Sequence, residues 1–578
     1  ILPAELRSHI LDRAESNPFY VEEIVRSLMD TGVIRYDPGL GLWQLTQEPA
    51  AVTIPDTLQG VLLARMDRLP AEARRVLQVA AVIGRLFPYS VLAAILPTDF
   101  NLDRQLAVLE ETGMVRERVR EPERELIFKH QLTQEAAYSG LLSAERRALH
   151  REVAQAIKAL FPDRLWAHAG LLAHHWQAAG EPNRAIPHLV RAGGAAVTRS
   201  AHAEAEAYLR RALVLAQETG LMLAEADALS RLAVVSRNQG NYPEAARYLE
   251  RSLEIYHRFS NRRREATLWA HLGRLNQRRG DFESAQKQLL CALESTRLVH
   301  DRHGEPAVLR DLGGVILDQG DLEAAVACFQ EALALEQQLQ DLPGVSLSLA
   351  CLANAWRRLG DFSAARQAAL ESVDLSARVH QPEVEAWVAL VSAWLLDELG
   401  EASEAHRHAR LVLQFAQQRG DRAIEGDARV VLANALFGLG RFSEARVSFE
   451  AAAEIRAALG ETHLLAEPFA GLLRLALKWG DTAEVAAKRV ALREQLERFS
   501  MQPGTIRPLA SYIALIASLS PEDPDRDVLA HTACELLSTQ AARITSAPLR
   551  QAYLNHIPVH QIIQQEAQRL VVGDCQSP

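Results

Sequence analysis

The sequence is poor in the residues that cross-link a fold. Five cysteines occur in 578 residues, and they are scattered, with no Cys-x-x-Cys pair. A disulfide framework or a cysteine-based zinc site is therefore excluded, and we expect reduced core cysteines. Aromatic residues make up only 6% of the chain, which favours a helix-rich composition. No apolar run approaches the ~20 residues that cross a bilayer, so no membrane span is predicted.

Motifs for chemistry are also scarce. No Gly-Lys pair occurs anywhere, which excludes a phosphate loop for ATP within this chain. Three histidines, His168, His174 and His175, share one predicted helix without a carboxylate or cysteine at ligand spacing, and we expect packing or surface roles rather than a metal. No catalytic constellation stands out. A formal net charge of −10 argues against broad nucleic-acid binding, because phosphates attract a positive field.

A strict 40-residue repeat is the strongest feature of the sequence. Small residues precede the repeating glycine by seven positions in six of the periods, and alanine follows it by five positions in six. The repeating glycines are Gly240, Gly280, Gly320, Gly360, Gly400, Gly440 and Gly480. Glycine ends a helix well because it adopts the left-handed C-cap conformation without a side-chain clash. Each period therefore predicts a helix hairpin, and neighbouring hairpins must stack to bury their faces.

The pattern Trp269, Leu272, Gly273, followed by Gly280-Asp281-Phe282 and Ala285, resembles the tetratricopeptide repeat, with a longer period than is usual for that family. The same spacing extends backwards, which predicts about eight hairpins from Glu181 to Ser500. Such an array usually binds a partner along the concave face formed by the first helix of each hairpin. A basic, amide-bearing stripe there could hold an acidic or C-terminal peptide segment; a solvated helix face is the alternative. The predicted stripe comprises Arg237, Asn238, Arg274, Arg278, Asn354, Arg357, Arg358 and Asn434.

The part of the chain before the repeats has a different pattern. Asn17-Pro18 predicts a helix start, and two short extended stretches follow. Helical patterns then run to Thr112, before two strand-like stretches, Met114 to Arg118 and Glu125 to Phe128. Three helices and a two-stranded wing in this order suggest a winged helix. Residues 56–158 carry 15 Lys plus Arg against 14 Asp plus Glu, and the third helix is acidic. Protein packing is therefore favoured over DNA binding.

Three segments together carry a wider resemblance: "AESNPFYVEEIVRSL", "IPDTLQGVLLARMDRLPAEARRVLQVAAVIGRLF" and "FKHQLTQEAAY". They resemble the C-terminal half of signal-transduction ATPases with numerous domains (STAND). In the bacterial members of that class a nucleotide-binding module, helical arm and winged helix precede tetratricopeptide repeats, and an adenylate cyclase or kinase domain often lies at the N-terminus. The resemblance implies a missing upstream module that binds ATP or ADP, and no cofactor in this chain.

The resemblance also implies two nucleotide-sensing residues. Pro18 matches the proline of the helical arm that packs on the adenine, although Ser16 stands where glycine is usual. His130 matches the winged-helix histidine that reaches the β-phosphate of ADP, with Gln131 in place of the usual aspartate. An imidazole N–H at a helix N-terminus suits contact with an anion. A local capping role for His130 is the alternative.

We therefore predict an all-α chain with a tetratricopeptide-type α-solenoid after a small winged-helix domain that carries a minor β-wing. The predicted function is the sensor half of a cytoplasmic signalling ATPase, with a protein, peptide or small-molecule ligand on the solenoid and the upstream module as its partners. A free-standing adaptor is the alternative, and a DNA-binding regulator is a third. The predicted divisions are a helical-arm remnant and hairpin at 1–50, the winged helix at 51–165, the repeats at 166–500 and capping helices at 501–578. Because the chain does not start with methionine, we expect it to be part of a longer polypeptide.

Overall fold

The computed structural model describes residues 4–14, 17–37, 42–46, 57–97, 101–121, 123–500 and 509–574. These residues form 29 α-helices and five short strands, so the predicted all-α class with minor strands near the N-terminus is confirmed. The chain divides into two compact units, residues 1–192 and 193–578. The division falls inside one helix, α10 (Pro182–Thr198). None of the helices in the described part of the chain is long and apolar enough to span a membrane.

The first unit mixes helices with two small sheets. Its elements are α1 (Ala4–Ala14), α2 (Pro18–Asp30), β1 (Ile34–Asp37), β2 (Leu42–Leu45), α3 (Leu58–Asp67), α4 (Ala71–Ile83), β3 (Leu86–Pro88), α5 (Tyr89–Ile95), α6 (Leu102–Glu111), β4 (Val115–Val119), β5 (Glu125–Phe128), α7 (Gln131–Ser139), α8 (Ser143–Leu160), η2 (Pro162–Arg164), α9 (Ala169–Ala178) and the start of α10. Asn17 caps α2 as predicted, because its side chain accepts hydrogen bonds from the backbone N–H groups of Phe19 and Tyr20. The two extended stretches expected after α2 form β1 and β2, and residues 38–41 between them lie outside the described residues.

The three-stranded sheet of the first unit has one strand more than the two-stranded wing that the sequence predicted. The strands run antiparallel in the order β3-β5-β4, and Phe87 of β3 lies opposite Leu126 of β5. Sequence patterns missed β3 because three residues ending in proline give no alternation to read. The rings of Phe87 and Phe128 meet edge to face, 5.6 Å between centroids, and both are fully buried. The sheet therefore closes the core formed by α3 to α8.

Arg65 of α3 joins α2 to this core. Its guanidinium is buried, pairs with Glu23 and Asp30 of α2, and donates to the backbone carbonyl of Thr112 at 2.8 Å. A buried arginine is stable only when carboxylates and acceptors satisfy its N–H groups. The pairing therefore holds α2 against the end of α6.

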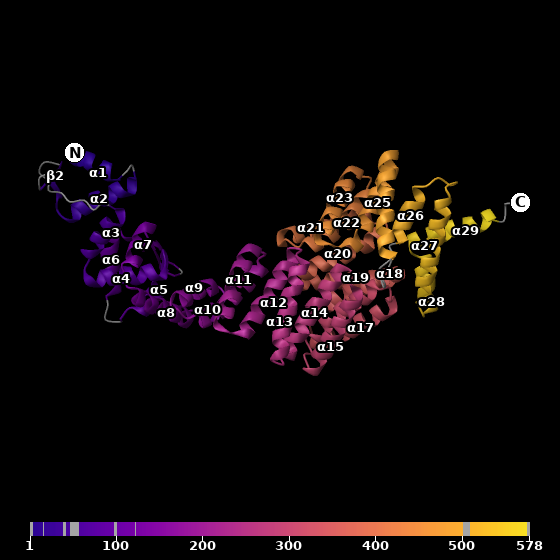
Figure 1. Ribbon diagram of the computed structural model, residues 1–578, viewed down its shortest axis with the longest axis horizontal. Coiled ribbons are helices and arrows are strands. Elements are labelled where there is room, and N and C mark those ends of the chain that lie inside the picture. Colours follow the sequence, from indigo (N-terminus) through magenta and orange to yellow (C-terminus); the bar gives the residue numbers. More distant parts are fainter. Residues whose placement is uncertain are drawn as a thin grey trace. The chain divides into compact units, whose positions relative to one another are not determined.

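The second unit is an array of helix pairs (Figure 1). Its elements after α10 are α11 (His202–Thr219), α12 (Met222–Asn238), α13 (Tyr242–Arg258), α14 (Arg262–Arg279), α15 (Phe282–Leu298), α16 (Glu305–Asp318), α17 (Leu322–Leu339), α18 (Leu342–Leu359), α19 (Phe362–Val379), α20 (Pro382–Glu398), α21 (Ala402–Arg419), α22 (Arg422–Gly438), α23 (Phe442–Leu459), η3 (Thr462–Leu464), α24 (Ala466–Trp479), α25 (Thr482–Ser500), α26 (Leu509–Ala517), α27 (Pro524–Ala542), α28 (Ala547–Asn555) and α29 (Pro558–Asp574). Seven pairs within this unit, α12/α13 to α24/α25, follow one another, as the 40-residue repeat predicted.

The repeating glycines adopt the backbone conformation that the sequence predicted. All seven, from Gly240 to Gly480, have positive φ angles between 71° and 88°. The turns between repeats use the same conformation, and there it often falls on other residues: Ser260, His300, Gln340 and His380 have φ between 52° and 56°. The left-handed turn therefore recurs twice in each of these repeats, whereas the repeating glycines indicated only one.

The small residues inside the first helices permit close helix packing. A Cβ atom on Gly273 would lie 2.6 Å from Leu289, and one on Gly313 would lie 2.6 Å from the ring of Phe329. Each of these pairs of helices thus interlocks through a small residue facing a large one, as the sequence predicted.

Candidate functional site

The residues that the sequence selected for binding lie on four first helices of the repeats, α12, α14, α18 and α22, and the first helices α16 and α20 fall between them in repeat order. We call the polar side chains on these helices the first-helix face. The repeat position occupied by Arg278 holds Asp318, Arg358 and Glu398 in the next three repeats. The charge therefore alternates in sign along the face, which predicts pairing between neighbouring helices.

The structure shows this pairing. Arg274 contacts Asp311 at 2.8 Å, which joins α14 to α16, and Arg358 contacts Asp318 at 3.2 Å, which joins α18 to α16. Arg357 pairs with Glu398 of α20 and also donates to the side-chain oxygen of Asn354 at 2.9 Å. Four of the five arginines in the predicted stripe, Arg274, Arg278, Arg357 and Arg358, therefore already have carboxylate partners from the chain itself.

Arg237 differs from the other arginines of the stripe. Within the described residues no carboxylate lies within ion-pair distance of its guanidinium, which donates to the Asn238 side chain at 3.2 Å. Burial, followed by the positive charge of Arg274, lowers the pKa of Arg237. An incoming carboxylate would relieve this repulsion. Whether Arg237, Asn434 and the rest form a binding stripe stays a prediction.

A second group of polar residues links parts of the array that are far apart in sequence. We call Tyr242, Arg278, Asp427, Arg456 and Glu461 the cross-turn cluster. The Tyr242 hydroxyl donates to Glu461 at 2.7 Å, across 219 residues. Arg278 lies 3.0 Å from Asp427 and 3.9 Å from Glu461, and Arg456 lies 3.4 Å from Asp427. Burial raises the pKa of Glu461. Burial opposes the charge of Arg278, but the neighbouring carboxylates outweigh it and raise the pKa of this arginine.

A similar sequence offset recurs in other contacts. His202 contacts the carbonyl oxygen of Arg419, 217 residues away, at 2.9 Å. Thr545 donates to Glu323 at 2.7 Å, across 222 residues. Offsets of this size equal about five and a half of the sequence repeats, so the array returns on itself after that number. The sequence did not indicate these contacts, since no local pattern records an offset of this length.

A partly buried carboxyl on the first-helix face makes stability depend on pH. Burial, followed by the charge of Glu398, raises the pKa of Asp397 from 3.8 to about 6. A carboxyl whose pKa rises on folding stabilises the folded state below its unfolded pKa, and this contribution is lost as pH rises through the folded value. We expect Asp397→Asn to raise the free energy of unfolding at pH 7 by about 1–2 kcal/mol.

Urea unfolding of the wild type and Asp397→Asn at several pH values tests this. The difference between the two proteins should shrink as pH falls from about 6 towards 4. Glu385→Gln, at the start of the same helix, is the control and should show little pH-dependent difference. A constant difference at all pH values would show that the Asp397 carboxyl is not responsible.

The two positions implied in nucleotide sensing come together in the first unit. The Phe19 ring, next to Pro18, lies 3.9 Å from the His130 ring, centroid to centroid. Pro18 itself is exposed at the start of α2. Lys129 pairs with Glu22 of α2 at 2.8 Å, which fixes the position of His130 beside this helix. Pro18 and His130 are 112 positions apart in the sequence, so only folding brings the two segments together.

His130 is the N-cap residue of α7 but makes no capping hydrogen bond with its side chain. Its Nε2 atom is buried and has no hydrogen-bond partner among the described residues. Burial and then Lys129 lower the pKa of the imidazole, against the raising effect of Glu22 and Glu23. The ring is therefore neutral at pH 7 and carries an unused nitrogen. The local capping role, which was the alternative interpretation, has no hydrogen bond to support it.

The exposed face of α6 bears on DNA binding. Asp103, Glu110 and Glu111 are exposed on this helix beside a single exposed arginine, Arg104. Asp103 also pairs with Arg124 from beside the sheet at 2.6 Å. Three carboxylates on the helix that would enter a groove repel a phosphate backbone.

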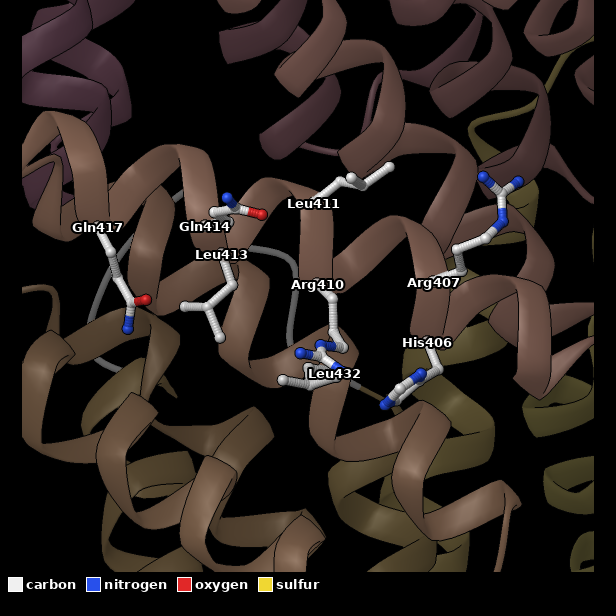
Figure 2. Close-up of a pocket in the computed structure, with 8 residues that line it drawn as sticks. All are labelled: His406, Arg407, Arg410, Leu411, Leu413, Gln414, Gln417 and Leu432. Carbon is white, nitrogen blue, oxygen red and sulfur yellow. The ribbon is translucent and has the colours of Figure 1, made fainter.

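A pocket of about 560 Å³ is lined by residues of α21 and by Leu432 of α22 (Figure 2). Its lining combines cationic and amide groups with leucines: His406, Arg407, Arg410, Leu411, Leu413, Gln414, Gln417 and Leu432. Arg441 lies 3.5 Å from the His406 ring nitrogen. The sequence gave no signal for this pocket, because its walls come from helix packing.

Comparison with known proteins establishes the repeats. Tetratricopeptide-repeat models match residues 224–298, 264–338, 345–383 and 427–464. An uncharacterized protein of Rhizobium meliloti is 30% identical over 223 residues, which is 38% of this chain. The matched part covers 20% of the length of that relative.

Solved structures match this chain at low similarity, and two of them are examples. One is a STAND protein with a tetratricopeptide repeat sensor from Pyrococcus horikoshii, with 12% identity, a TM-score of 0.39, and coverage of 96% of this chain and 75% of the other. The second is the apo form of the quorum sensor NprR from B. thuringiensis, with 15% identity, a TM-score of 0.40, and coverage of 56% and 90%. The repeat models, rather than these structures, establish that the chain contains tetratricopeptide repeats.

Proposed function

We propose that this tetratricopeptide-repeat chain is the regulatory and sensor part of a STAND-type signalling ATPase. The observation that carries the proposal is the meeting of Phe19 and His130, which places an unpartnered imidazole nitrogen beside the helix that Pro18 begins. The nucleotide itself would belong to the upstream module. Pro18 would face its base, and His130 Nε2 would donate a hydrogen bond to its phosphate.

The repeats would supply the sensor. The first-helix face is internally paired, so a protein or peptide that binds there must compete with ion pairs such as Arg274 with Asp311. Carboxylates of the ligand would first meet Arg237, which has no ion-pair partner in the described part of the chain. We call the array with these ion pairs formed the closed state, and the array in which a ligand has replaced them the loosened state. A ligand that binds the loosened state more tightly shifts the population towards that state. This shift would weaken the hold of His130 on the nucleotide-bound module.

ATP turnover by the full-length polypeptide tests the regulatory role. Loss of the His130 contact should destabilise the resting state, so His130→Ala should raise turnover in the absence of any ligand, by roughly tenfold if the hydrogen bond contributes about 1.4 kcal/mol. Leu132→Ala, at an exposed position of α7 outside the His130-Gln131 pair, is the control and should leave turnover unchanged. Equal turnover in all three proteins would contradict the proposal and favour an adaptor without a nucleotide connection.

Peptide binding by the repeats is tested separately. We expect acidic peptides to bind the chain of 578 residues, and Arg237→Ala to weaken this binding by roughly tenfold, the loss of one charge-assisted hydrogen bond. Arg247→Ala, an exposed arginine on the second helix α13, is the control. Binding that both substitutions weaken equally would indicate general charge attraction rather than the first-helix face.

A further inference from the structure

Three histidines converge in the first unit, outside both sites described above. His150 on α8 and His175 on α9 are buried, and His174 is exposed on α9. The Nδ1 atoms of His150 and His175 lie 2.8 Å apart. One ring nitrogen from each of the three residues lies within 4.8 Å of the others. The sequence predicted no metal here because it grouped only histidines of one helix. In the structure the third histidine of the cluster, His150, comes from the preceding helix α8.

The surroundings of His150 suit a metal ligand. The Tyr138 hydroxyl lies 3.0 Å from His150 Nε2, so the second ring nitrogen has a partner while Nδ1 points at His175. A ligating histidine usually engages its other nitrogen in this way, which fixes the tautomer and the ring orientation.

We propose that His150, His174 and His175 bind one divalent transition-metal ion of the zinc class. Zinc with nitrogen ligands at ~2.0–2.1 Å in a tetrahedron separates those nitrogens by about 3.3 Å. The His150 and His175 nitrogens are already near this spacing, and the exposed His174 ring lies 5.7 Å from the His150 ring, centroid to centroid. An all-imidazole set favours Zn²⁺, Ni²⁺ or Cu²⁺ over Mg²⁺ and Ca²⁺, which prefer oxygen. Solvent on the His174 side would complete the fourth position.

Titration of the chelator-treated protein with Zn²⁺ alone tests the site, with Co²⁺ as a spectroscopic probe. We expect one equivalent to bind, with the visible absorption of tetrahedral Co²⁺ in the same stoichiometry. His174→Ala removes a ligand on the surface and leaves the buried pair intact, so the variant should fold. It should weaken binding by more than the ~10–100-fold that loss of an outer-shell partner causes.

The chain has 19 histidines, so metal could also bind to histidines scattered over the surface. Two further variants distinguish such binding from a single built site. Tyr138→Phe should weaken Zn²⁺ binding by ~10–100-fold through the loss of the His150 hydrogen bond. His168→Ala, on the segment just before α9, is the matched control and should bind as the wild type does. Binding that is absent, or that His174→Ala does not change, would overturn the proposal and leave His150 and His175 as a packed pair. The result does not depend on the proposed signalling function.

Discussion

Replacing Arg278 by alanine should destabilise the repeat unit by about 3 kcal/mol or more. Arg278 faces Asp427 and Glu461, whose side chains are 10% and 0% exposed. Removal of one partner from a buried ion pair leaves an uncompensated charge and costs about 3–5 kcal/mol. Arg456 still lies 3.4 Å from Asp427, so we place the loss at the lower end of that range.

The measurement is urea unfolding, compared through the transition midpoint at constant slope. Arg378→Ala is the control, because Arg378 pairs with Asp374 on the surface, where both side chains are largely exposed and the pair contributes less than ~1 kcal/mol. Tyr242→Phe offers a milder variant that keeps the packing and removes one buried hydrogen bond, at a cost of about 1–2 kcal/mol. If Arg278→Ala behaves like Arg378→Ala, the contact across the turn does not form in solution.

This result also bears on the proposed signal. If the cross-turn cluster holds the array closed, Arg278→Ala should resemble the loosened state that a ligand favours. In the full-length polypeptide we then expect Arg278→Ala to raise ATP turnover without ligand, as His130→Ala does. A destabilised protein with unchanged turnover would show that closure of the array and the nucleotide switch are separate.

Gly360→Ala should destabilise the protein by about 3 kcal/mol, and Gly400→Ala by only about 1–2 kcal/mol. The two glycines occupy the same repeat position with φ of 77° and 76°, so both substitutions carry the same left-handed strain, roughly 1–2 kcal/mol. A Cβ on Gly400 meets nothing within 4 Å, whereas one on Gly360 would lie 2.6 Å from the carbonyl oxygen of Ala552 in α28. Backbone cannot move aside cheaply, which adds about 1–3 kcal/mol.

The pair of glycine variants isolates the docking of the C-terminal helices. His556 also contacts the Gly360 carbonyl oxygen, 3.0 Å from its ring nitrogen. We therefore expect Gly360→Ala, and not Gly400→Ala, to increase amide hydrogen exchange in α28, besides lowering the free energy of unfolding. Equal losses for the two variants, with unchanged exchange in α28, would show that this helix does not sit on the Gly360 turn.

Local patterns in the sequence were sufficient for the helices and for their pairing within a repeat. Gly273 predicted a close approach to its partner helix, and the structure places Leu289 there. Asn17 predicted the start of α2 from the capping chemistry of its own side chain. Such features depend on residues close together in the chain, so one sequence records them. The strand β3 was missed because its stability comes from pairing with β5, a distant segment that lies beyond α5, α6 and β4, rather than from its own short sequence.

The candidate sites were less predictable for the same reason. The arginines of the first-helix face were selected from the sequence, but their carboxylate partners were overlooked, although Asp318 and Glu398 stand at the repeat position of Arg278. His150 and His175 belong to different helices, and nothing local indicates that the two rings meet. His130 and Pro18 were named together only through a family resemblance.

The 40-residue spacing by itself determined a stack of helix hairpins, because glycine ends each helix and small residues let each pair nest. Only the tertiary structure decided where that stack returns to meet itself, since the offset of about five and a half repeats depends on small rotations that add up over many interfaces. That offset places Tyr242 against Glu461 and Glu323 against Thr545. No sequence pattern near either contact predicts this offset.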